Sequence, residues 1–68
     1  MSHLTSKTKV VYVAMLYDEY DNYVGESGNR DTMEGALYDG EEMVSDLVEK
    51  TDKYHFAEIK TKILPVWG

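Results

Sequence analysis

The pattern of apolar and polar positions divides the chain into four predicted elements. A β-branched and aromatic run over Lys9–Tyr17 predicts a strand, and Tyr23–Glu26 predicts a short second strand after a polar turn. Apolar residues at three- and four-residue spacing over Met33–Val48 predict an amphipathic helix, and the alternating run Tyr54–Ile63 predicts a last strand. This order predicts an α+β fold (β-β-α-β), a small antiparallel three-stranded sheet with one amphipathic helix packed across it.

The predicted helix has one apolar face and one acidic face. The apolar positions are Met33, Ala36, Leu37, Gly40, Met43, Val44, Leu47 and Val48. Asp31 and Glu34 have the spacing of a helix N-cap and its reciprocal acid, so we expect the helix to begin after Asp31. Gly40 lies on the apolar face, where a missing side chain lets a helix approach a sheet.

The first predicted strand is apolar on both of its faces. One face can pack against the helix, and the other then needs a second cover. We assign to that second face Val10, Tyr12, Ala14 and Leu16. A dimer partner or the C-terminal tail could supply the cover, and we interpret residues 65–67 as such a tail, with a partner-binding anchor as the alternative.

Length and composition indicate a single small domain. The chain has 68 residues; residues 1–8 are polar and without a period, which predicts a flexible N-terminal tail before one α+β domain over residues 9–68. A domain of this size has a thin stability margin, and the absence of cysteine excludes a disulfide. With His3 and His55 as the only histidines we expect no metal and no cofactor, and self-association as a homodimer becomes the expected source of extra stability.

No apolar run approaches the roughly 20 residues of a membrane span, and Met1–Lys9 lacks the apolar core of a signal peptide. We therefore expect a cytoplasmic protein, in the host cell's cytoplasm if the chain is viral.

Charge is concentrated in the middle of the chain. The net charge is −6, but Tyr17–Glu49 holds eleven acidic residues and a single basic one, Arg30. Such a segment repels nucleic acid and anionic membranes, and it attracts basic partners at long range.

Few residues of the chain could support catalysis. There is no cysteine nucleophile and no glycine-rich phosphate loop, and Ser27 and Ser45 have no histidine signature nearby. His55 lies in a predicted strand, where a structural role is the ordinary one, and adjacent acids such as Glu41 and Glu42 diverge on a helix. We expect a binding protein and no enzyme.

The acids of the helix and of the hairpin turn form the candidate partner-binding surface, together with two turn tyrosines. These residues are Asp18, Glu19, Asp21, Glu34, Asp39, Glu41, Glu42, Asp46, Glu49, Tyr20 and Tyr23. On a helix the acids from Glu34 to Glu49 follow one another at about one charge per 4 Å, close to the roughly 3.4 Å of one DNA strand.

An ordinary solvated surface is the competing interpretation of these acids. An exposed helix usually gains stability from lysines four residues from its acids, yet no base occurs between Arg30 and Lys50. Asp46 and Glu49 also lie near the helix C-terminus, where the dipole disfavours negative charge. Both features favour a functional role for the negative charge over an ordinary solvated surface.

The run Val13–Leu16, leading into Asp18, Glu19 and Asp21 with Tyr20 and Tyr23 in the turn region, resembles the strand and acidic loop of the uracil-DNA glycosylase inhibitors of small Bacillus phages. The resemblance covers about a third of the chain, and the longer helix and the tail Leu64–Gly68 depart from it. It implies a small acidic phage protein that mimics DNA and inhibits a basic DNA-binding host protein by occupying its nucleic-acid site. The alternative is a structural or assembly protein that docks through its apolar sheet face and C-terminal tail.

Overall fold

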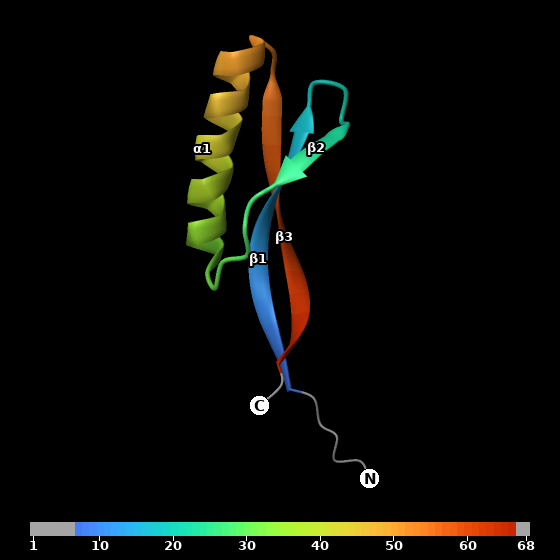
Figure 1. Cartoon of the computed structure of the whole chain (residues 1–68), viewed down its shortest axis with the longest axis vertical. Coiled ribbons are helices and arrows are strands. Elements are labelled where there is room, and N and C mark those ends of the chain that lie inside the picture. Colours follow the sequence, from blue (N-terminus) through green and yellow to red (C-terminus); the bar gives the residue numbers. More distant parts are fainter. Residues whose placement is uncertain (1–6, 67–68) are drawn as a thin grey trace.

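The computed structural model describes residues 7–66, which form three strands and one helix (Figure 1). In chain order these are β1 (Lys7–Asp18), β2 (Tyr23–Glu26), α1 (Met33–Thr51) and β3 (His55–Val66). The strand order is β2-β1-β3 with antiparallel pairing throughout, and α1 lies across β1 and β3. The predicted α+β fold is confirmed.

β1 and β3 form a long twisted ribbon that extends beyond the helix (Figure 1). Their pairing is continuous from Lys7 opposite Val66 to Asp18 opposite His55. β1 therefore begins inside the segment that was expected to be a flexible tail. Residues 64–66 continue β3 and do not fold back as a cover for the sheet, which corrects the prediction for that part of the tail. Trp67 lies outside the described residues.

The helix begins one residue later than its sequence predicts. Thr32 is the N-cap, with an extended backbone and a hydroxyl oxygen that accepts a hydrogen bond from the N–H of Gly35 at 3.1 Å. Asp31 is not the cap, because its carboxylate pairs with the ammonium of Lys9 at 2.8 Å. At the other end Asp52 adopts a left-handed conformation (φ 59°) that closes the last turn.

Small residues set the contact between helix and sheet. A Cβ added to Gly40 would lie 2.9 Å from the Cβ of Ala14 in β1 and 3.2 Å from that of Ala57 in β3. The helix axis therefore passes above the space between β1 and β3. The predicted close approach at Gly40 is confirmed, but within α1 only Ala36 and Gly40 are fully buried. Met33, Leu37 and Val48, which were predicted on the buried face, are exposed: Leu37 and Val48 lie on a flank of the helix, and Met33 is its first residue.

The helix covers the face of β1 for which a second cover was predicted, so that assignment is wrong. Ala14 lies under Gly40, and alternation places Val10, Tyr12 and Leu16 on the same face. Since both faces of β1 are apolar, the sequence pattern did not distinguish them.

The opposite face of β1 is covered by the chain's own polar and aromatic side chains. Val13 is fully buried there. Lys62 of β3 lies opposite Val11, Glu26 of β2 lies opposite Met15, and their side chains form an ion pair of 2.6 Å. Because β1 runs between these two strands, the ion pair must cross β1 near Val13, and the lysine methylenes can cover apolar surface there.

An aromatic row extends this cover across the three strands. The ring centroids of Tyr23 and Tyr17 are 6.3 Å apart, those of Tyr17 and Phe56 5.3 Å, and those of Phe56 and Tyr54 5.9 Å. The Tyr23 hydroxyl donates to the Glu26 carboxylate at 2.9 Å, which joins the row to the ion pair. The second cover thus comes from within the chain.

Candidate partner-binding site

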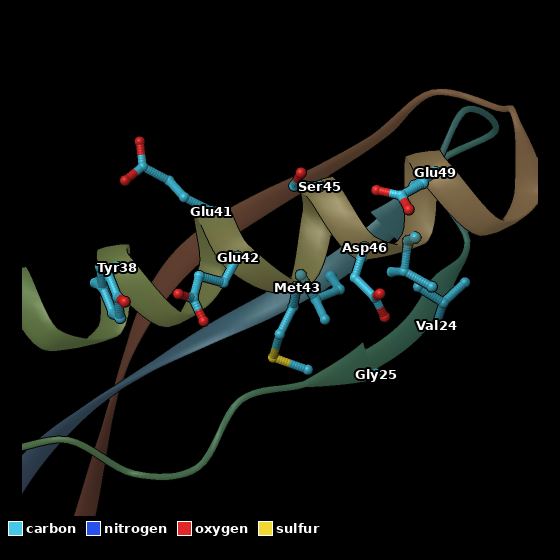
Figure 2. A pocket seen from close by; sticks show the side chains of 11 residues that line it. Val24, Gly25, Tyr38, Glu41, Glu42, Met43, Ser45, Asp46 and Glu49 are labelled. Carbon is cyan, nitrogen blue, oxygen red and sulfur yellow. The ribbon is translucent and has the colours of Figure 1, made fainter.

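A groove of about 810 Å³ opens between α1 and β2 (Figure 2). It exists because α1 lies over β1 and β3 and leaves β2 at the uncovered edge of the sheet. Its apolar surface comes from both layers of the fold: Leu16, Val24, Gly25, Met43 and Leu47.

A bulge in β2 shapes one wall of this groove. Leu16 pairs with Gly25, but the next residue, Tyr17, pairs with Tyr23, so Val24 is left without a partner in β1. Val24 lines the groove, whereas Tyr23 packs on Tyr17 at the opposite face of the sheet. At Gly25 an added Cβ would meet nothing within 4 Å, so the groove has room for a side chain there.

The helix supplies an acidic rim along the groove. Glu42, Asp46 and Glu49 follow one another at four and three residues, which places them along one side of a helix. In Figure 2 the side chain of Asp46 extends toward β2, and that of Glu42 lies below α1, on the side opposite to Glu41. A hydrogen bond to Glu42 raises the pKa of Tyr38, at the start of the rim, and Lys50 lies 3.1 Å from the Asp46 carboxylate.

Three other predicted helix acids do not contribute to this rim. Asp39 forms a bidentate ion pair with Arg30, at 2.7 and 2.8 Å, which lowers the pKa of Asp39 and neutralises its charge. Glu34 lies in the first helical turn, away from the groove. Glu41 borders the groove, but its side chain points away from β2 (Figure 2).

The acids of the hairpin turn have mainly local contacts. The Asp18 carboxylate accepts hydrogen bonds from the backbone N–H groups of Asn22 and Tyr20, at 2.9 and 2.8 Å, which lower the pKa of Asp18. Asp21 has a left-handed backbone (φ 65°) that the turn requires. Glu19 and Tyr20 are exposed at the tip of the turn. The predicted surface is therefore divided: part of it lines the groove, and the turn residues form a separate patch.

Within residues 7–66, no group of three or more histidine, cysteine, aspartate or glutamate residues is arranged to hold a metal ion. His55 is buried, and its Nδ1–H donates to the carbonyl of Lys53 at 2.9 Å, which is a structural role. No helix in the described part of the chain is long and apolar enough to cross a membrane.

Sequence reasoning missed the apolar surface of the groove and the role of Tyr38. A signal for part of it was present, since the acids of the rim follow a single helical stripe beside Met43 and Leu47. The contribution of Val24 and Gly25 was not predictable, because it depends on which sheet edge α1 leaves uncovered.

Comparison with known proteins gave no relatives: no protein family, no curated protein and no solved structure matches this chain.

Proposed function

We propose that this chain is a non-enzymatic binding protein, acting in the cytoplasm, that uses the acidic groove to occupy the nucleic-acid site of a basic protein. A phage-encoded inhibitor that mimics DNA would work in this way. The observation that carries the proposal is the combination of three rim carboxylates, Glu42, Asp46 and Glu49, with an apolar surface directly beside them; Asp46 also forms an exposed ion pair with Lys50, which a partner's basic group would have to replace. Both features suit lysine and arginine side chains.

The apolar part of the groove favours long basic side chains over small cations. Lysine and arginine carry three or four methylenes below the charged group, and these pack on apolar surface while the charge reaches a carboxylate. Met43 and Leu47 lie on α1 next to the rim acids, so one basic side chain can use both kinds of contact. A surface evolved to bind phosphates presents many such side chains together.

The rim is less dense in charge than the sequence suggested. Glu42 to Asp46 and Asp46 to Glu49 correspond to axial rises of about 6 and 4.5 Å, against about 3.4 Å between charges on one DNA strand. Asp39 does not fill the gap because Arg30 neutralises it. The mimicry we propose is therefore partial, with apolar contact replacing some of the charge.

The experiment compares two charge reversals of equal size on the same helix. The immobilised chain is used to capture proteins from a bacterial lysate, and elution is attempted with duplex DNA and with salt. The Glu42→Lys variant should no longer capture a basic protein that the parent binds. The Glu34→Lys variant should still capture it, because Glu34 lies outside the groove. Duplex DNA should release it, and moderate salt should weaken it.

A groove-filling change gives a second, uncharged test. Gly25→Leu places a side chain in the open space of the groove without straining the backbone, since Gly25 has no positive φ. Gly28→Leu is the matched control, because Gly28 also has open space around it but lies outside the groove. Equal capture of the same DNA-competed protein by both variants would contradict the proposed site.

The alternative function, a structural or assembly protein, has one observation in its favour. Val10 and Ile63, which pair with each other, expose apolar surface on one face of the part of the β1–β3 ribbon that extends beyond the helix. A partner held by that surface would persist or bind more tightly at high salt and would not be displaced by DNA.

A further inference from the structure

β3 is an edge strand with an unpaired outer side. It is 12 residues long and pairs only with β1 in the described part of the chain, so one side of its backbone has free N–H and C=O groups. Long edges of this kind pair readily with another strand, unless charges or proline prevent it.

We propose that β3 pairs with β3 of a second copy of this chain, antiparallel and about a two-fold axis at Ile59. The result is a symmetric dimer with one continuous sheet of six strands, three from each copy. A two-fold axis normal to the sheet pairs residues of the same face, so both helices lie on the same side.

The charges on β3 select this register. Pairing about Ile59 places Glu58 opposite Lys60 of the second copy, and the reverse, so that opposite charges face each other twice. A two-fold axis at Glu58 or at Lys60 would instead bring identical charges into direct opposition. An axis at Thr61 would oppose Lys60 to Lys62 and draw Pro65, which has no N–H, into the pairing.

The position of the helix leaves space for its counterpart. Gly40 lies over both Ala14 and Ala57, so the axis of α1 lies about half a strand spacing inside β3. With strands about 4.8 Å apart, the two helix axes would be about 10 Å apart near the two-fold axis. Helices in direct contact have their axes about 8–10 Å apart. The N-terminal turns of the two helices, residues 33–38, would therefore pack side by side without moving, and the rest of each helix would extend past the other.

The dimer would cover some of the apolar side chains that the single chain leaves exposed. Leu37 and Val48 are 49% and 39% exposed and lie on the flank of α1 that faces away from the acidic rim, a flank that also carries Glu41. Met33, 57% exposed, lies in the first helical turn on the side that faces the sheet. Gly40 is level with Ala57, and α1 runs antiparallel to β3, so Leu37 lies near the two-fold axis. Ile63, 68% exposed, would lie opposite His55 of the second copy, beneath the C-terminal half of its helix.

This inference does not depend on the proposed function. The groove opens on the β2 side of α1 and the dimer forms on the β3 side, so each dimer would present two free grooves.

The test exchanges the two charges that define the register. Analytical ultracentrifugation of the parent should show a dimer at micromolar concentration. Lys60→Glu and Glu58→Lys should each raise the dimer dissociation constant by about tenfold or more, because like charges then face each other. The double variant Glu58→Lys/Lys60→Glu should dimerise like the parent, and the two single variants should form a heterodimer when mixed. A monomeric parent, or single variants that dimerise like the parent, would overturn the proposal.

Disulfide formation checks the register independently, since the chain has no cysteine of its own. Ile59→Cys should form an intermolecular disulfide on mild oxidation, because the two copies of this residue face each other. Ile63→Cys is the control, since its two copies would be eight residue positions, or about 26 Å, apart along the paired strands. A disulfide in the Ile63→Cys variant and none in the Ile59→Cys variant would contradict the register.

Discussion

The two faces of β1 are both buried, but by different means. On the helix face, burial depends on the absence of a side chain at Gly40, because this absence allows α1 to pack directly against Ala14 and Ala57. On the opposite face, Val13 is buried beneath a cover that includes the long side chain of Lys62, held in place by Glu26. The first kind of cover depends on the close packing of small, uncharged residues. The second depends on the length of one side chain and on an ion pair. Substitutions and changes of pH that affect this second cover should therefore change the free energy of unfolding by smaller amounts.

The largest effect is expected on the helix face. Gly40→Val adds side-chain atoms where even a Cβ would lie 2.9 Å from the Ala14 Cβ, and neither alanine can move its Cβ without moving a strand. We expect a loss of about 3 kcal/mol in the free energy of unfolding, measured by urea denaturation. Gly28→Val, in open space, should change it by less than about 0.5 kcal/mol. Similar values for the two variants would mean that the helix does not sit as closely on the sheet as described.

An intermediate effect is expected from Lys62 on the opposite face. Lys62→Ala removes both the charge and the methylenes that cover Val13, and should cost about 1 kcal/mol. Lys62→Met keeps an unbranched apolar side chain of similar length, so it should cost about 0.5 kcal/mol or less, because a partly exposed ion pair contributes little. If methionine were as damaging as alanine, the ion pair would matter more than the cover.

The smallest effect is expected from pH, and it should appear on the same face. Hydrogen bonds from Lys62 and Tyr23 lower the pKa of Glu26 from its ordinary value of 4.5. A carboxyl with a lower pKa in the folded state stabilises the fold above its ordinary pKa, and that contribution is lost as the pH falls through the folded value. Denaturation of Glu26→Gln should therefore show a shallower loss of stability than the parent below pH 4.5. If the pH dependence of the free energy of unfolding were the same in this variant as in the parent, Glu26 would contribute nothing to the stability of this cover.

The order and type of the elements were predictable from the sequence because each has a strong local pattern. The alternation in β3 and the period of α1 need no tertiary information. The N-cap was misplaced because Asp31, a good capping residue, pairs with Lys9, which is distant in the sequence. Local rules do not include such competition.

Local sequence patterns could not predict which face of β1 packs against the helix, nor the shape of the candidate site, for a different reason. Val13 and Ala14 are both apolar and both fully buried, so alternation does not separate their faces. The small residues Ala14, Gly40 and Ala57 were a usable signal, since three such residues on three elements permit close contact. The groove follows only from the strand order, which places β2 at the edge beside the helix.

The bulge at Val24 makes one part of the groove separable from the rest of the fold. Because Leu16 pairs with Gly25 and Tyr17 with Tyr23, removing Val24 would leave a regular ladder, with Tyr23 and Glu26 still on the face opposite the helix. The chain could therefore gain or lose this groove wall through a change of one residue in length, without repacking its core. Variation in length at this point would change the shape of the groove while the pairing of β1 with β3 stays the same.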